Sequence, residues 1–129
     1  MDNGSKETNY STMLVPASVG VTQLHNFFKK KYELDDGEAE ILVLSSSQSL
    51  IDFITAAESI LDNRGQEDSS EKREALVHRG KGLFLVMGQE EWALYVTALN
   101  VNDLTTVYDN IQMIVDHVRQ GFSDIIITC

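Results

Sequence analysis

The chain contains 129 residues with 20 acidic and 10 basic side chains, which gives a formal net charge of −10 and a pI near 4.5. This length suits one domain, and a hydrophobic content of 43% argues against wholesale disorder. The acidic excess disfavours nucleic acid as a partner, because such binding depends on basic contacts with phosphates.

Cysteine content and hydropathy indicate where the protein resides. Cys129 is the single cysteine, so an internal disulfide cannot form. The N-terminal residues lack the basic start and apolar run of a secretory signal. Apolar runs reach only four or five residues, whereas a membrane-spanning helix needs about 20. We therefore expect a cytoplasmic or otherwise intracellular protein without membrane contact.

The first part of the chain predicts an arm followed by a helix. Residues 1–20 are polar or small and predict a flexible or loosely docked N-terminal arm, which precedes a single domain over residues 21–129. From Thr22, the expected N-cap, to Tyr32, the apolar residues recur every three or four positions, as in an amphipathic helix. We expect this helix to end at residues 35–37, Asp-Asp-Gly.

The next segment predicts a strand and a second helix. Residues 41–44, Ile-Leu-Val-Leu, form a continuous apolar run that is typical of a strand covered on both faces. The serine-rich residues 45–49 predict a short turn. The apolar stripe from Leu50 to Leu61 predicts a helix that Gly65 closes. This order corresponds to the first half of a β-α-β unit.

The middle of the chain predicts an exposed loop and then strands. Residues 63–74 are almost wholly polar and predict the loop. Residues 75–78 and 83–87 flank a glycine-containing turn and predict a hairpin, and the alternating residues 91–99 predict a third strand. The first of these strands has an alternative, because residues 70–78 also fit a short helix.

The last two elements complete the predicted architecture. Residues 104–118 repeat at helical spacing, with Asn102 as the N-cap and Gly121 at the end, and residues 125–127 predict a buried strand. The element order is α-β-α-(β)-β-β-α-β. It predicts one α/β domain with a mixed sheet of four to five strands and about three helices packed on it.

Two predicted turns offer a candidate anion site. Ser46, Ser47 and Ser49 precede the second helix, where free backbone N–H groups favour an anion. Arg79 and Lys81 lie in the predicted hairpin turn. A small anionic ligand between the two turns is one interpretation. The other interpretation is that the serines cap the helix and that the basic turn is an ordinary solvated turn. The absence of a glycine-rich phosphate motif favours this second interpretation.

The strand predicted at residues 91–99 offers a candidate partner surface. It carries Trp92 on one face and Tyr95 on the other, and at a sheet edge it could pair with a partner's strand. His78 and Arg79 lie in the basic cluster of residues 72–81 and complete this candidate surface. The alternative is that the protein's own helices cover both faces of the strand.

The sequence contains no motif for catalysis or for a metal. The three histidines have no ligand spacing, and neither a nucleophile elbow nor a complete calcium loop is present. We therefore expect no cofactor and no metal, and the balance of the observations is against an enzyme.

These observations favour a non-catalytic protein-interaction module. Such a protein is an acidic adaptor, a regulatory subunit or an assembly subunit, and it acts through a surface or an edge strand on a protein partner or a second copy of itself. The alternative is a small ligand-binding or enzymatic α/β domain with an anion site between residues 45–49 and 79–81. A nucleic-acid mimic is disfavoured, because the acidic residues are dispersed as on an ordinary solvated surface.

Overall fold

The protein is a bundle of helices. A computed structural model describes residues 15–63, 70–98 and 106–127, and within these residues it contains six helices and no strand. The helices in chain order are α2 (Val21–Tyr32), α3 (Asp36–Asp62), α4 (Ser70–Val86), α5 (Glu90–Ala98), α6 (Val107–Gly121) and α7 (Ser123–Ile127).

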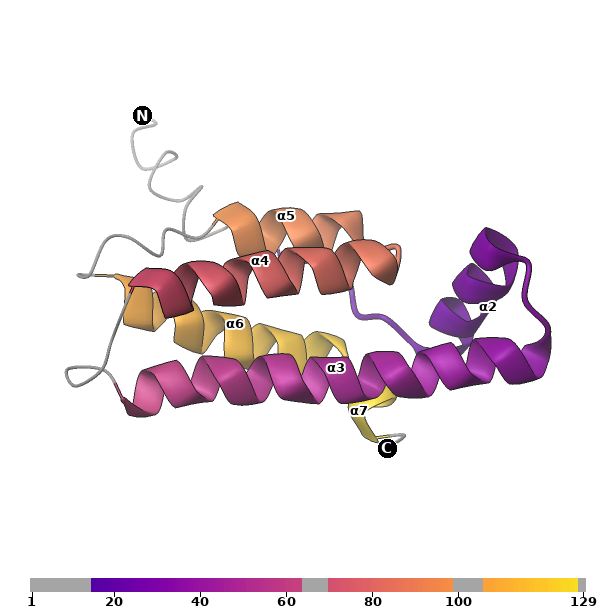
Figure 1. Ribbon diagram of the computed structural model, residues 1–129, viewed down its shortest axis with the longest axis horizontal. Helices are drawn as coiled ribbons and strands as arrows, with labels where there is room; N and C mark the ends of the chain where they lie inside the picture. The colour runs from indigo at the N-terminus through magenta and orange to yellow at the C-terminus, as the bar shows by residue number, and fades with distance from the viewer. Residues whose placement is uncertain (1–14, 64–69, 99–105, 128–129) are drawn as a thin grey trace, which may run out of the picture.

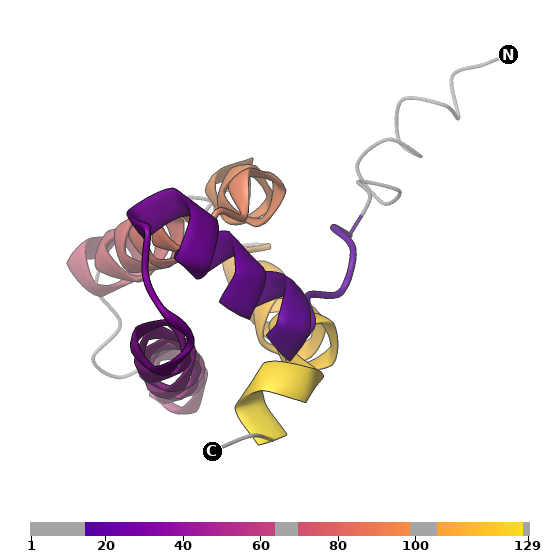
Figure 2. The same cartoon turned by 90° about the vertical axis from the view of Figure 1, so that its right-hand side faces the viewer.

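Four of these helices form the body of the bundle. The helices α3, α4, α5 and α6 run alternately in opposite directions; α3 packs against α4 and α6, and α4 packs against α5 (Figure 1). The helix α2 lies across one end of the bundle and contacts α3 (Figure 2). The short α7 packs against α3 and α6. The predicted α/β class is therefore wrong: the described residues contain no sheet for the helices to pack on.

The predicted strand at residues 41–44 and the turn at 45–49 both lie inside α3. This helix begins with a capping box, in which Asp35 accepts a hydrogen bond from the Glu38 N–H (2.8 Å) and Glu38 accepts one from the Asp35 N–H (3.0 Å). The Asp-Asp-Gly segment thus starts a helix, although the sequence analysis expected it to end one. Ile41 belongs to the apolar run but is 65% exposed, because it lies on the outer face of α3.

The predicted strands in the second half of the chain are also helical. Residues 75–78 and 83–87 fall in or directly after α4, residues 91–98 fall in α5, and residues 125–127 fall in α7. For residues 75–78, the alternative of a helix that begins at residue 70 is confirmed. Residues 70–74, which were predicted to belong to the loop, are therefore part of this helix. A real turn follows α4, where Gly88 adopts a positive φ of 75° that favours glycine.

The three helices predicted from apolar periodicity are confirmed in α2, in the second half of α3 and in α6. The helix α2 begins at Val21 and its N-cap is Gly20, so the expected N-cap at Thr22 is wrong. The predicted boundaries at Gly65 and Asn102 lie outside the described residues.

An aromatic cluster holds the helices together. The ring of Phe84 on α4 lies 5.9 Å from Phe53 on α3, 5.9 Å from Trp92 on α5 and 5.4 Å from Phe122, which joins α6 to α7. All four side chains are at most 1% exposed. Burial of large aromatic rings contributes strongly to stability, so this cluster fixes how the helices pack.

Residues 15–20 precede α2 and lie against the same cluster. The Trp92 indole donates a hydrogen bond to the Ala17 carbonyl (3.1 Å), and the Val19 N–H donates to the Gly121 carbonyl (2.8 Å). Val19 itself is buried. This segment therefore connects α5 with the end of α6.

Two glycines of α4 have opposite surroundings, which predicts opposite effects on stability. A Cβ at Gly80 would lie 2.7 Å from the buried ring of Phe53, whereas a Cβ at Gly82 would meet nothing within 4 Å. We expect Gly80→Ala to lower the free energy of unfolding by about 1–3 kcal/mol, because the core is already filled. Gly82→Ala should raise it by about 0.5–1 kcal/mol, because alanine favours a helix. Urea denaturation measures both changes, and equal effects would contradict the packing of α3 on α4.

Candidate functional site

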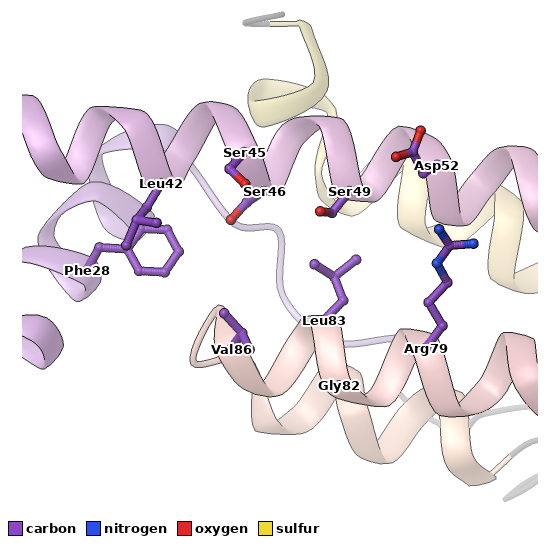
Figure 3. Close-up of a pocket in the computed structure, with 10 residues that line it drawn as sticks. All are labelled: Phe28, Leu42, Ser45, Ser46, Ser49, Asp52, Arg79, Gly82, Leu83 and Val86. Atoms are coloured by element: carbon purple, nitrogen blue, oxygen red, sulfur yellow. The ribbon is translucent and has the colours of Figure 1, made fainter.

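An apolar groove lies between α3 and α4. The part of the groove next to α2 is a cavity of about 300 Å³ (Figure 3). Phe28 reaches it from α2, Leu42 from α3, and Leu83 and Val86 from α4. The remaining lining residues are Ser45, Ser46, Ser49, Asp52, Arg79 and Gly82. The groove is therefore apolar at the α2 end and becomes polar toward Arg79.

A second cavity continues along the same two helices. It has a volume of about 460 Å³, and Ala56, Ile60 and Leu76 supply apolar surface to its lining. The other lining residues are Ser59, Lys72, Ala75 and Arg79. Arg79 lines both cavities, and the two together are named the α3–α4 groove, with Arg79 where they meet.

Small residues leave this groove open. The small residues of its lining are serines and Ala56 on α3, and Ala75 and Gly82 on α4. The two helices meet instead on the core side, where Phe53 of α3 packs against Gly80 of α4. A side chain at Gly82 would project into unoccupied space, so nothing in the described fold requires glycine there.

The polar groups in the middle of the groove have no protein partner. Ser46 is only 6% exposed, and its hydroxyl makes no hydrogen bond with any described residue; the same holds for Ser49 and for the guanidinium of Arg79. Asp52 differs, since it accepts a hydrogen bond from the Gln48 amide (3.0 Å) and its carboxylate turns away from Arg79 (Figure 3). No buried side-chain oxygen or nitrogen of the described residues lacks a hydrogen-bond partner, so the hydroxyl of Ser46 reaches the solvent in the groove.

The structure brings together part of the anion site expected from the sequence. Ser46, Ser49 and Arg79 line the same groove, although they come from helices and not from turns. Ser47 points elsewhere, since its hydroxyl donates to the Ile125 carbonyl (3.0 Å), and Lys81 is exposed and lines neither cavity. Within α3 the backbone N–H groups are used by the helix, so the expected backbone cradle for an anion does not form.

The candidate partner residues separate into two groups. Trp92 and Tyr95 are 1% and 4% exposed and belong to the aromatic core. His78 and Arg79 are exposed on α4, and only Arg79 lines the α3–α4 groove. Sequence reasoning missed Phe28, Leu42 and Val86 as a shared surface, because their pairing depends on how α2, α3 and α4 pack.

A third cavity lies on the opposite side of α4, between residues 15–17 and α5. Its volume is about 500 Å³, and Leu94, which is 68% exposed, contributes to its lining. Glu91 is the charged residue among its described lining. None of the residues that line this cavity is basic.

Residues 15–63, 70–98 and 106–127 contain no group of three or more histidine, cysteine or acidic side chains that could hold a metal ion. None of the helices described for this chain is both long enough and apolar enough to cross a membrane.

Comparison with protein-family models, with curated proteins and with solved structures finds no match to this chain.

The Tyr95 hydroxyl forms a hydrogen bond with His117 Nδ1 and joins α5 to α6. Burial, with a smaller effect from the charge of Asp116, raises the pKa of Tyr95 to about 12. In the unfolded chain this pKa is about 10. Between these two values the unfolded state loses a proton that the folded state keeps, so stability falls as the pH rises.

We therefore expect the free energy of unfolding to decrease more steeply between pH 10 and 12 for the wild type than for Tyr95→Phe. Urea denaturation at several pH values measures this difference. Absorbance at 295 nm reports the titration of the tyrosines directly, and the step near pH 12 should be absent from the variant. Equal slopes for the two proteins would contradict the burial of Tyr95.

Proposed function

We propose that this protein is a non-catalytic protein-interaction module, an adaptor, regulatory or assembly subunit that binds a partner protein in the α3–α4 groove. The observation that carries the proposal is an open apolar groove with an unpartnered arginine in its middle. Exposed apolar surface combined with a few polar groups is characteristic of protein-binding sites.

The size and rigidity of the groove support a protein partner. It extends from Lys72 to Val86 along α4, which at 1.5 Å per residue corresponds to about 21 Å. Its walls are the two longest helices of the described chain. Ile41, Leu44 and Leu85 are further exposed apolar residues on these two helices. A preformed apolar groove binds a partner with little loss of conformational entropy.

The groove is favoured over the cavity beside α5 by its polar middle. The guanidinium of Arg79 is exposed at this place, and a partner can supply a hydrogen-bond acceptor for it. A different protein is favoured over a second copy of this chain, because two molecules with a net charge of −10 repel each other. A single cysteine favours an intracellular location for this interaction.

A small anionic ligand is the second candidate function. Ser49 and Arg79, which line the same cavity, support it, since a hydroxyl and a guanidinium both donate hydrogen bonds to anions. Such a ligand would leave the apolar walls at Phe28, Leu42 and Val86 uncovered. For this reason the protein partner is the favoured interpretation.

Two neighbouring residues of α4 provide a matched test. Val86 is 55% exposed and lines the groove, whereas Leu85 is 47% exposed and lines neither cavity. Val86→Glu should weaken binding of the captured partner at least tenfold, because a charge enters apolar surface. Leu85→Glu should leave binding within about twofold.

The measurement is affinity capture with the wild type from a native extract, identification by mass spectrometry, and titration of the purified partner by calorimetry. Circular dichroism controls for folding of both variants. Retention of the partner by both variants, or its loss from both, would contradict binding in the groove.

A further inference from the structure

The corner between α2 and α3 joins the two helices through a short connector, residues 33–35. We infer that this corner can straighten into one continuous helix, and that two copies of the chain then exchange residues 15–32 and form a domain-swapped dimer. Phe28, which lines the α3–α4 groove, would then reach each groove from the other copy. This inference goes beyond the proposed function and does not depend on it.

The connector holds its turn with a strained residue. Glu33 has a φ of 56° and a ψ of 52°, and among the described residues it is the one residue other than glycine with a positive φ. Glycine is usual at this end of a helix, because a Cβ disfavours the left-handed conformation. Glu33 and Leu34 both favour a helix, so a straight connector releases the strain and suits the sequence.

A capping box opposes the straightening. The Asp35 carboxylate accepts a hydrogen bond from the Glu38 N–H (2.8 Å), and the Glu38 carboxylate accepts one from the Asp35 N–H (3.0 Å). Both bonds require α3 to begin at Asp36, because in a continuous helix the two N–H groups donate to the carbonyls of residues 31 and 34. The bent and straight forms therefore differ by two local effects of opposite sign and comparable size.

The buried residues of α2 and α3 share one helical register. Phe28 of α2 and Ala39 of α3 are 11 residues apart, which is about three turns of a helix. Leu24 and Val43, also buried, lie four residues further along on either side. In a straight helix the apolar stripe of α2 therefore continues that of α3, and α2 presents this stripe to a second molecule.

The contacts that α2 leaves on straightening are remade on the second copy. Phe28 is 1% exposed in the bent form, and the Val21 N–H donates to the Asp124 carboxylate of α7 (2.8 Å). An α2 from another copy carries the same side chains and fills the same place, so exchange leaves the core complete. This helix contains three lysines and no acidic residue, and its positive charge favours docking on either copy of an acidic chain.

Exposed apolar residues beside the connector favour a second copy as the occupant. Ile41 is 65% and Leu44 is 43% exposed on the first turns of α3, which project beyond α4, α5 and α6 (Figure 1). In a straight helix Leu34 lies two turns before Ile41 on the same face, with Gly37 between them. Two straight helices that cross at Gly37 about a two-fold axis would bury this face against its own copy.

Size-exclusion chromatography with light scattering measures the exchange. The full chain is held at about 1 mM in about 0.5 M NaCl, which screens the repulsion between acidic chains, and is warmed below its unfolding temperature. The wild type should yield a fraction with twice the mass of one chain. This fraction should persist after dilution in the cold, because a return to the monomer requires α2 to leave the other copy.

Two connector substitutions should shift the dimer in opposite directions. Glu33→Gly should lower the dimerisation constant about 10- to 100-fold, because glycine adopts the left-handed turn without strain and weakens a straight helix. Asp35→Ala should raise it about 10- to 100-fold, because the substitution removes the cap of the bent form and alanine favours a helix. Shifts of the same sign would overturn the inference.

Ile41→Glu tests the face between the copies. It should lower the dimerisation constant at least about tenfold, because it brings a charge into apolar surface, and it should leave the melting temperature of the monomer unchanged. Thr55→Glu is the matched control, since Thr55 is exposed on the same helix far from the connector, and dimerisation should stay within about twofold. Equal effects of the two variants would overturn the inference.

Spin-label distances distinguish exchange from contact between two bent copies. The labels are attached at Thr22→Cys and Gln48→Cys in a Cys129→Ser background, and labelled chains are mixed with excess unlabelled chains before warming. In the bent form the labels lie near each other, because Val21 and Ser47 both form hydrogen bonds with α7. In a straight helix their positions are separated by about 39 Å, at 1.5 Å per residue.

A dimer with the long distance within each labelled chain is the result that the inference predicts. A dimer that keeps the short distance of the monomer would overturn it. Wild type and Asp35→Ala that both stay monomeric under these conditions would overturn it as well. Binding of a partner in the α3–α4 groove is tested separately by Val86→Glu, so failure of either proposal leaves the other standing.

Discussion

The contact between Phe53 and Gly80 determines the distance between α3 and α4. A Cβ on Gly80 would lie 2.7 Å from the Phe53 ring, so the ring lies against the backbone of α4. On the same side, Phe84 joins Phe53 to Trp92 and Phe122 and completes a buried aromatic cluster. Large rings therefore fill the inner side of this helix pair. On its outer side, serine, alanine and glycine lie among the larger lining residues, and the groove stays open.

The proposed function follows from this unequal packing. A helix pair that is tightly packed on one side and open on the other presents a rigid groove, which needs no rearrangement before a partner binds. Gly82 and Ser46 both lie in the open part. Glycine weakens a helix, and a side chain at Gly82 would meet nothing within 4 Å, so the fold of the unbound protein does not explain glycine at this position.

The sequence predicted helices where large apolar residues keep a helical period, as in α2, α6 and the second half of α3. It failed where small or polar residues occupy buried positions. In α3, Ala39, Ser46 and Ser47 continue the spacing of Val43 and Leu50, yet serine carries no apolar signal. In α4, the sequence predicts a turn at Gly80, which the structure buries inside the helix. Ser46, Ser49 and Arg79 were identified as candidates, but the apolar walls of their groove depend on tertiary packing.

The structure of the protein bound to its captured partner tests the central claim most directly. A crystal structure of that complex should show a segment of the partner in the α3–α4 groove, in contact with Val86 and Arg79. A partner bound against α5 at Leu94, with the α3–α4 groove left open to solvent, would contradict the account.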